Sequence, residues 1–249
     1  MPDPNISILT ATLNAAAVLP RLIACLRAQT DRDFEWIVAD GGSTDGTQAL
    51  LRDASDLRVH LTEAPDFGIY DALNRGVRIV SDGYYLVLGA DDMLDPGAVA
   101  NFRQAACEAG RPDFVAAAIW QDGRKIPPRR GMGWLYGIQG VASSHAVGLL
   151  IKKDLHASHG MYSNKFPIAA DQFFVKTALM RGATIARANF IAGEFSTQGM
   201  SGRDPLGVLT EIFRCQVKTE RYLLPQYIIF LLRLGKHYFR SLSPRAPRR

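Results

Sequence analysis

The sequence of this 249-residue chain predicts an α/β fold: a mainly parallel β-sheet flanked by helices, with a helical tail. Short apolar runs alternate with amphipathic stretches through the first half, which is typical of β–α–β units and therefore of parallel strands. Hydrophobic residues make up 47% of the chain, enough to bury the core of one such domain. From about Pro205 the pattern becomes helical and then basic. We therefore expect one domain over residues 1–204 and an amphipathic, basic helical tail over residues 205–249.

The apolar runs and the helical spacings place the expected elements. Strands are expected at Ile6–Leu13, Phe34–Ala39, Leu57–Thr62, Tyr84–Leu88 and Val147–Ile151. Helices are expected around Leu19–Leu26, from Thr47 onward, and at Ile69–Val80 and Ala169–Arg181. The stretch Arg124–Gly137 is rich in Gly, Pro and Arg, which predicts a mobile loop.

Cysteine usage and hydropathy exclude several classes of protein. The three cysteines are far apart, and no Cys or His spacing suggests a disulfide framework or a zinc site, so a reducing compartment is expected. The first residues lack the basic and apolar regions of a signal peptide. The longest uncharged stretch near the end, Tyr222–Leu232, is far shorter than the about 20 residues that a transmembrane helix needs. We expect no segment that crosses a membrane.

The net charge of +5 is concentrated at one end of the chain. Residues 233–249 hold six Lys or Arg and no acid, which leaves the other residues at −1. A nucleic-acid binder of this size would more typically carry a basic stripe across its folded body. The charge distribution therefore predicts no nucleic-acid partner.

Acidic residues follow three of the expected strands. Asp40 ends the second strand, Asp66 lies shortly after the third, and Asp91 and Asp92 follow the fourth. Parallel sheets bind ligands at the carboxyl ends of their strands, and carboxylates next to buried strands are costly unless a cation compensates them. Mg²⁺ or Mn²⁺ held by carboxylates can neutralise a departing nucleoside diphosphate, while a separate carboxylate takes a proton. The pattern favours nucleotide chemistry.

Four segments in order resemble the family 2 glycosyltransferases, which have a nucleotide-binding GT-A fold. They are ISILTATLN with LRAQTDRDFEWIVADGGSTDGT, then PDFGIYDALNRG, YYLVLGADDML, and HAVGLLIKKDLHASHGMYSNKFPIAADQFF. The resemblance covers roughly residues 5–202, and it is strongest to enzymes of bacterial O-antigen and exopolysaccharide assembly. It implies a cytoplasmic enzyme, at the inner face of the cell membrane, that uses a UDP- or GDP-sugar and a lipid-linked glycan acceptor.

The resemblance also implies a role for each matching residue. Asp40 would contact the base or ribose, with Thr10 and Thr12 beside it. Asp66 would lie near the nucleotide, and His145 would bind the diphosphate or the acceptor. Asp91 would face the ribose or the metal, Asp92 would be the principal ligand of Mg²⁺ or Mn²⁺, and Asp171 would be the catalytic base of an inverting displacement.

Gly89 departs from the family pattern, which often has an acid at this position of Asp-x-Asp-Asp. Adjacent residues on an extended strand point in opposite directions, so Asp91 and Asp92 need a turn if both are to bind one ion. The Gln-x-x-Arg-Trp motif of processive synthases is missing from the sequence, which predicts the transfer of one sugar per acceptor.

Each candidate also has a purely structural interpretation. Asp40 and Asp66 suit turns, and Asp171 suits the N-cap of a helix. His145 could be a hydrogen-bonded core histidine. Asp45 is expected to cap a helix.

Other polar residues are expected at the surface. Asn74 and Arg75 are expected on the polar face of a helix. His156 and His159 suit one face of a surface helix better than a metal site. The stretch Glu194–Arg203 is expected to be a mobile loop.

In the tail, basic and apolar residues fall on different sides of a helix. Arg233, Lys236 and Arg240 share one side, and Tyr227, Phe230, Leu231 and Leu234 another. This pattern indicates either a helix in an anionic membrane interface or a terminal helix docked on the domain.

Two further functions compete with the transferase. One is a nucleotidyltransferase, which would need a basic, glycine-rich loop where this sequence is acidic. The other is a membrane-associated nucleotide-sugar binding protein without catalysis, a possibility that Gly89 leaves open.

Overall fold

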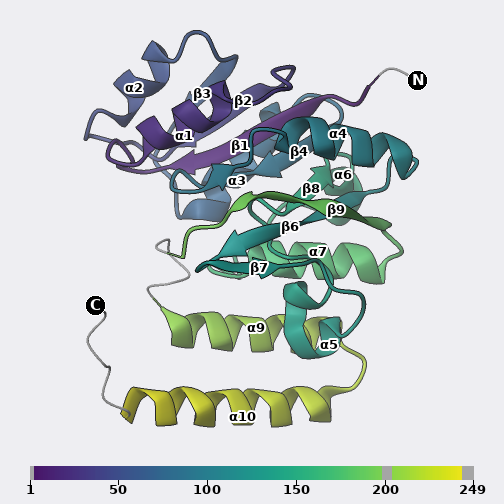
Figure 1. Cartoon of the computed structure of the whole chain (residues 1–249). Coiled ribbons are helices and arrows are strands. Elements are labelled where there is room, and N and C mark those ends of the chain that lie inside the picture. Colours follow the sequence, from purple (N-terminus) through teal and green to yellow (C-terminus); the bar gives the residue numbers. More distant parts are fainter. Residues whose placement is uncertain (1–2, 198–203, 243–249) are drawn as a thin grey trace.

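The computed structural model describes residues 3–197 and 204–242 and confirms the α/β fold (Figure 1). One mixed sheet runs through the molecule in the order β3-β2-β1-β4-β8-β6-β9-β5, with β7 beside β6. The first four strands are β1 (Ile6–Thr12), β2 (Glu35–Asp40), β3 (Val59–Glu63) and β4 (Tyr84–Val87). The others are β5 (Met93–Leu94), β6 (Phe114–Gln121), β7 (Arg124–Ile126), β8 (Leu149–Lys152) and β9 (Ile185–Glu194).

The strand directions bring distant segments of the chain to one edge of the sheet. Strands β1 to β4 are parallel, β8 is antiparallel to both β4 and β6, and β9 is parallel to β6. The ends of β1, β2, β4 and β9 and the beginning of β8 therefore share one edge. The Val147 N–H, just before β8, donates to the Val87 carbonyl at the end of β4 (2.9 Å).

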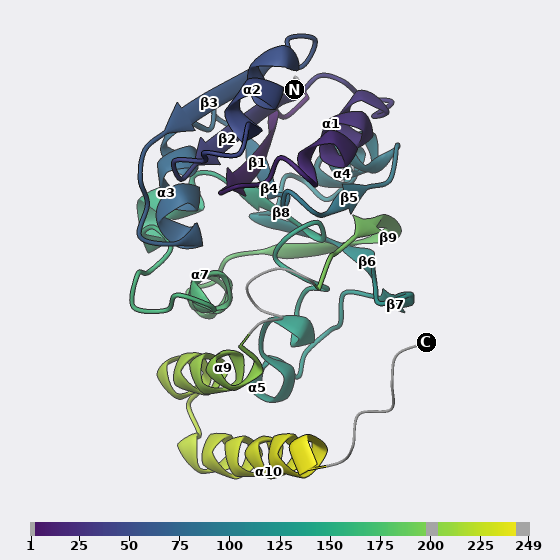
Figure 2. The ribbon, with the colours of Figure 1, turned by 90° about the vertical axis from the view of Figure 1, so that its left-hand side faces the viewer.

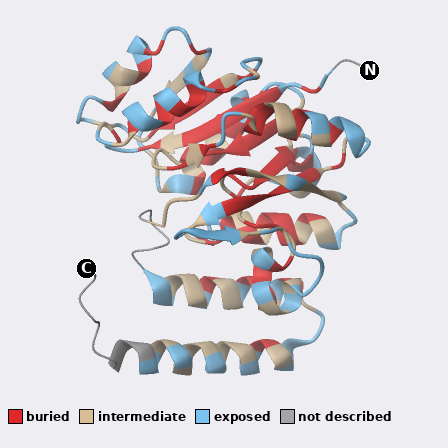
Figure 3. Ribbon diagram, in the orientation of Figure 1, coloured by how far each residue is buried: buried red, intermediate tan, exposed pale blue. Residues whose placement is uncertain are grey.

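Helices cover both faces of the sheet (Figure 2). They are α1 (Leu19–Arg27), α2 (Thr47–Asp53), α3 (Ile69–Ile79), α4 (Ala98–Glu108), α5 (Gly133–Tyr136), α6 (Leu155–His159), α7 (Ala170–Met180), α9 (Pro205–Thr219) and α10 (Leu223–Leu242). Neighbouring side chains of β1 point to opposite faces, so Ile8 joins a core with α1, α2 and α4, whereas Leu9 joins a core with α3 and α7. Figure 3 shows the buried residues concentrated in the sheet between these layers.

Helix α3 lies unusually close to the sheet. A Cβ on Gly76 would come within 2.2 Å of Leu9 Cδ1, so only glycine lets the helix approach β1 this closely. Tyr70, Leu73 and Val77 are buried at helical spacing on the same side. The close packing fixes the direction in which α3 presents its first turn, which carries Tyr70.

The C-terminal helices continue the layers in the order α7, α9, α10 (Figures 1 and 2). Helix α9 packs against α7 and buries Cys215 completely. Helix α10 docks on α9, where Phe230 stacks on Phe213 with ring centroids 4.4 Å apart. The boundary at residues 204/205 stays a prediction, but α9 shares the core of the preceding residues.

Several elements differ from the sequence-based expectation. Strands β6 and β9 and helix α4 were not predicted, and Arg124–Gly137, expected as a loop, contains β7 and all of α5. Of the predicted loop Glu194–Arg203, residues 198–203 lie outside the described residues, as do Arg245, Arg248 and Arg249 of the tail. None of the helices in the described residues is long and apolar enough to cross a bilayer.

Candidate active site

A pocket of about 190 Å³ opens at the edge of the sheet where β4 and β9 end and β8 begins. It brings together four of the predicted site residues: Asp91, Asp92, His145 and Asp171. Three of these are acids, and neither Lys nor Arg is among the described residues that line the pocket. A cluster of carboxylates without a cation favours a site that receives a positive ion.

Asp92 is the most buried acid of the pocket, with 3% of its surface exposed. Its Oδ2 accepts the Gly89 N–H (2.8 Å) and its Oδ1 accepts the Ser196 N–H (2.8 Å), so the carboxylate joins the ends of β4 and β9. Burial raises the pKa of Asp92 to about 7, with a smaller contribution from the charge of Asp91. An ion bound here would offset the cost of burying the charge.

The turn that two neighbouring ligands require is present. The Asp92 N–H donates to the Gly89 carbonyl (3.1 Å), which closes a turn over residues 89–92. A Cβ on Gly89 would lie 3.1 Å from Asp91 Oδ1 and 2.8 Å from Asp92 Oδ2, so both carboxylates face the space beside this glycine. A side chain at position 89 would crowd them, because a Cβ 2.8 Å from Asp92 Oδ2 would force this carboxylate to shift.

These residues fit an octahedral Mg²⁺ or Mn²⁺ only in part. No group of three or more His, Cys, Asp or Glu side chains within residues 3–197 and 204–242 has the arrangement of a metal site. Asp91 and Asp92 offer carboxylate oxygens, which are the ligands that Mg²⁺ prefers, and this ion commonly takes its other ligands from phosphates and water. The site therefore fits a metal that arrives with, or is completed by, a diphosphate.

Asp171 lies in the first turn of α7, but it does not cap the helix. Ala169 occupies the N-cap position, and the buried Glu211 of α9 accepts the N–H groups of Ile168 and Ala169 through Oε2 (2.9 Å each). The side chain of Asp171 thus stays in the pocket, 22% exposed. Its Oδ1 lies 2.8 Å from the Tyr70 hydroxyl.

His145 faces the other oxygen of Asp171, with 3.8 Å between Nδ1 and Oδ2. The ring is buried, and desolvation lowers the pKa of His145 although the charge of Asp171 acts in the opposite direction. Burial therefore favours the neutral form of His145. A neutral imidazole beside a carboxylate can hold or receive a proton, which suits acid–base chemistry.

Asp40 lies at the same edge of the sheet, at the end of β2, and shapes the loop that follows. Its carboxylate accepts hydrogen bonds from the Thr12 and Ser43 hydroxyls, the Gly42 and Ser43 N–H groups and the Gln48 amide. These donors outweigh desolvation and lower the pKa of Asp40 to about 2. Because the side chain is fully buried, its visible role is to hold the loop, and a direct contact with a base or ribose stays a prediction.

The other predicted nucleotide contacts lie in different surroundings. Thr12 is bound to Asp40, whereas Thr10 is fully buried and accepts the Trp36 indole N–H (3.0 Å), so its hydroxyl serves the packing of the sheet. Asp66 lies against the Asp40 loop, since a Cβ on Gly41 would meet its carboxylate. Asp66 Oδ1 also accepts the Gly68 N–H (3.0 Å), as expected of a turn.

Three further residues have surroundings that differ from those expected. Arg75, expected at the surface, donates to the Asp40 carbonyl (2.7 Å), and its buried Nε has no hydrogen-bond partner among the described residues. Asn74 pairs with the backbone of Tyr162 (2.8 and 2.9 Å). His156, expected on a surface helix, is buried and stacks on Phe174.

Asp45, expected as a helix cap, lies one residue before the N-cap Gly46. Its carboxylate accepts hydrogen bonds from the Thr47 N–H (3.1 Å) and from the Ala16 N–H (3.0 Å). It thereby links the start of α2 to the loop after β1.

Sequence reasoning did not identify Tyr70, Ser196 or Glu211. Tyr70 lies inside the PDFGIYDALNRG motif, which was a usable signal for a functional side chain. Ser196 acts through its backbone N–H, which donates to Asp92, and Glu211 acts as an acceptor at the start of α7. Each lies more than 40 residues along the chain from its partner. Contacts of this kind depend on the tertiary fold, so no local sequence pattern predicts them.

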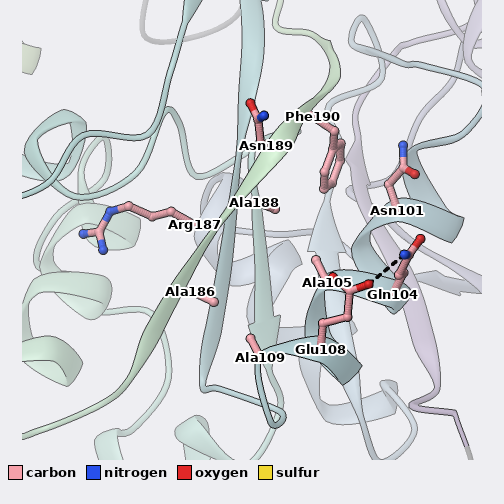
Figure 4. Close-up of a pocket in the computed structure, with 10 residues that line it drawn as sticks. All are labelled: Asn101, Gln104, Ala105, Glu108, Ala109, Ala186, Arg187, Ala188, Asn189 and Phe190. Atoms are coloured by element: carbon pink, nitrogen blue, oxygen red, sulfur yellow. Dashed lines mark hydrogen bonds between the residues drawn. The ribbon is translucent and has the colours of Figure 1, made fainter.

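A larger cavity, of about 490 Å³, lies between α4 and the first half of β9 (Figure 4). Glu108 is the only acid among its described lining residues, and it accepts a hydrogen bond from the Gln104 amide (2.7 Å). The residues of β9 that line it, Ala186–Phe190, belong to the opposite end of the strand from Ser196. With no paired acids or bases among its described lining residues, this cavity lacks the chemistry of the first pocket.

Comparisons with known proteins agree with the geometry. The chain matches the family model "Glycosyl transferase family 2" over residues 7–150, and it therefore belongs to that family of enzymes. It is 44% identical over 97 residues to a PGL/p-HBAD biosynthesis glycosyltransferase of Mycobacterium tuberculosis, a match that spans only 38% of each chain. It is 30% identical over 233 residues to an uncharacterized glycosyltransferase of the same organism, covering 88% of this chain and 86% of the relative.

Solved structures show the same GT-A fold. One is S. aureus TarS 1–349 in complex with UDP-GlcNAc, with a TM-score of 0.66, 16% identity, and coverage of 96% of this chain and 73% of that one. Another is the mannosyltransferase PcManGT from Pyrobaculum calidifontis in complex with GDP-Man and Mn²⁺, with a TM-score of 0.68, 19% identity, and coverage of 93% and 69%. The chain is thus a family 2 glycosyltransferase with a GT-A fold.

Proposed function

We propose that this enzyme transfers one sugar from a UDP- or GDP-sugar to a hydroxyl of a lipid-linked glycan, with inversion at the anomeric carbon. The observation that carries the proposal is the single pocket that joins Asp91 and Asp92 on one side to Asp171 and His145 on another. A transferase needs a site for the departing diphosphate and, separately, a base for the attacking hydroxyl. The related proteins bound to UDP-GlcNAc and to GDP-Man support a nucleotide-sugar donor.

The donor side of the pocket would hold the diphosphate. Asp91 and Asp92 would bind Mg²⁺ or Mn²⁺, which supplies charge neutralisation for the leaving group when it is bound. The Mn²⁺ in the GDP-Man complex of the mannosyltransferase supports this assignment. The nucleoside and its phosphates would bind at the loop that Asp40 holds. Thr12, Asp66 and the guanidinium of Arg75, which has one unpaired nitrogen among the described residues, would contribute to this site.

The acceptor side would carry the proton transfer. Asp171 would take the proton from the acceptor hydroxyl as the oxygen attacks the anomeric carbon on the face opposite to the diphosphate. One displacement of this kind inverts the configuration, and it needs no covalent intermediate on the enzyme. The nucleotidyltransferase alternative is set aside by the family match.

Calorimetry on the wild-type protein tests the donor proposal. We expect UDP or GDP, and the corresponding sugar nucleotides, to bind about 10-fold or more tightly with Mn²⁺ than with a chelator, because a cation joins two sets of negative oxygens. ATP with Mn²⁺ serves as the control for unspecific binding of metal phosphates. Equal affinity with and without metal would contradict the metal site, and binding without any transfer to glycolipid acceptors would favour the binding protein without catalysis.

Helix α10 supports a peripheral contact with a membrane, on a different face from the one expected. Of the two interpretations of the tail, the docked helix fits the side that carries Phe230 and Arg233, since Phe230 packs on α9 and Arg233 donates to the Leu135 carbonyl. The side chain of Arg240 lies outside the described residues. The opposite side of the helix carries exposed apolar residues: Leu224, Ile228, Leu231, Leu232, Tyr238 and Phe239. An apolar stripe on a docked helix suits shallow insertion into a lipid interface.

A charge placed on this stripe should release the protein from lipid. We expect the double variant Leu231→Glu, Leu232→Glu to bind vesicles of anionic phospholipid at least about 10-fold less tightly. Each substitution removes apolar area that would insert into the lipid and adds a charge that the anionic lipid repels. Sedimentation with vesicles measures the bound fraction. Met180→Glu is the matched control, since Met180 is similarly exposed (62%, against 64% and 69%) but lies on α7. Loss of binding only in the control variant, or in neither, would contradict the assignment.

A further inference from the structure

A chain of buried hydrogen bonds leads from the pocket into the core. His145 Nε2 lies 2.8 Å from the Tyr162 hydroxyl, which lies 2.6 Å from the Tyr85 hydroxyl. The Tyr85 hydroxyl lies 2.6 Å from His156 Nε2, and His156 Nδ1 lies 3.0 Å from the Gly160 carbonyl oxygen. The four side chains come from different segments: β4, the loop before β8, α6 and the loop after it.

The last contact of this chain fixes the direction of every other one. A carbonyl oxygen can only accept, so His156 Nδ1 carries the hydrogen that is donated to Gly160. Burial lowers the pKa of His156 to about 4, which leaves the ring neutral with a lone pair on Nε2. Tyr85 must therefore donate to His156 and accept from Tyr162.

The same reasoning then assigns the tautomer of His145. The Tyr162 hydroxyl donates its only hydrogen to Tyr85. The Tyr162 oxygen must therefore accept a hydrogen bond from His145 Nε2. A neutral imidazole has one N–H, and the lone pair of His145 must then be on Nδ1. This nitrogen is the one that faces Asp171 Oδ2 at 3.8 Å. The two atoms are too far apart for a hydrogen bond in the resting structure, and because both are acceptors, a closer approach requires a proton between them.

We infer that His145 Nδ1 accepts a hydrogen bond from Asp171 once this carboxylate has taken the proton of the acceptor hydroxyl, and that Tyr162, Tyr85 and His156 are positioning residues that keep the Nδ1 lone pair available. This inference rests on the proposed transferase function. The acceptor O–H bond breaks, its electron pair forms the new glycosidic bond, and the diphosphate leaves with the electron pair of the old one. The proton moves to Asp171 Oδ2, where a hydrogen bond to Nδ1 stabilises the protonated carboxyl and makes Asp171 a stronger base. The Tyr70 hydroxyl, whose single hydrogen is shared between Asp171 Oδ1 and the Ile168 carbonyl (2.8 Å each), lies at the other oxygen, which leaves Oδ2 for this role.

Nitrogen NMR of the uniformly labelled, full-length protein tests the tautomer without any substrate. We expect His145 to show a protonated Nε2 and an unprotonated Nδ1, and His156 the reverse. In Tyr85→Phe, Tyr162 loses its acceptor and turns its hydrogen toward His145 Nε2, so the proton of His145 moves to Nδ1. A wild-type His145 with a protonated Nδ1 would overturn the inference.

Transfer kinetics supply the second measurement. Tyr85→Phe should lower kcat about 10-fold, less than the roughly 10²–10⁴ that an acid–base group itself contributes, with little change in the KM for the donor. Tyr84→Phe is the matched control: it is the adjacent buried tyrosine, its hydroxyl donates to the Pro112 carbonyl (2.6 Å), and it joins the core on the other face of the sheet. Equal kcat in the two variants, with the His145 tautomer unchanged, would overturn the inference. A wild type that binds no donor would instead refute the proposed function, and the NMR result would still decide the tautomer.

Discussion

Asp171→Asn should lower the rate of sugar transfer at least about 10²-fold while the affinity for the donor stays within about 2-fold of wild type. The carboxamide has nearly the shape of the carboxylate and can still accept from Tyr70 through its oxygen, so the first turn of α7 should keep its position. It has no basic oxygen that can take up the acceptor's proton. The loss should therefore appear in kcat, with the KM for the donor nearly unchanged.

The measurement is a steady-state transfer assay with a labelled donor, combined with calorimetry for donor binding. Asp82→Asn is a suitable control, because this substitution makes the same change in charge at a side chain that is 98% exposed. A transfer rate within a few-fold of wild type would remove Asp171 from the role of base. An equal loss of donor affinity would indicate instead that Asp171 binds the nucleotide sugar.

Asp92→Asn should abolish the effect of Mn²⁺ on donor binding and lower kcat/KM by about 10² or more, since a metal at the leaving group contributes several kcal/mol to the transition state. The metal-free variant should be at least as stable as the wild type. Burial raises the pKa of Asp92 because the charged form is poorly solvated, and a neutral amide escapes this cost. The backbone N–H groups of Gly89 and Ser196 donate to different oxygens of Asp92, so one of them loses its acceptor in the variant, a cost that we expect to be smaller than that of burying the charge.

Thermal unfolding in the presence of a chelator separates the two effects. A variant with the midpoint of wild type or higher, and no response to Mn²⁺, would match the expectation. Asp95→Asn offers a nearby control, because Asp95 follows the same loop but is absent from the described lining of the pocket. A variant that still responds to Mn²⁺ would move the ligand role to another residue.

The sequence predicts the parallel half of the sheet well and its other half poorly, for a physical reason. The runs that become β1, β2 and β4 are apolar and bounded by turn residues, so their period and length identify them. Strand β6 contains Ala116, Ala117 and Ala118, all buried, but alanine has low β propensity, and only packing between two helical layers makes this segment extended. Strand β9 is half-exposed and bulged against β6, so neither alternation nor a continuous apolar run marks it.

The candidate site divides in the same way. Asp91 and Asp92 are predictable because acids directly after a buried strand need a compensating partner. The surroundings of Asp171 are not predictable, since Tyr70 lies 101 residues away and the tautomer of His145 depends on Tyr85 and His156. His156 reads as a surface residue from its spacing to His159, because nothing local reveals that Phe174 covers it.

The carboxylate of Glu211 has a consequence for how this enzyme can be shortened. It is a residue of α9, and it holds the backbone from which Asp171 projects. Removing residues from 205 onward would therefore expose two unpaired amide groups beneath the reacting centre and let the start of α7 fray. Helix α9 therefore braces the acceptor side of the pocket, and a force applied to it at a lipid surface would be transmitted to the base as well.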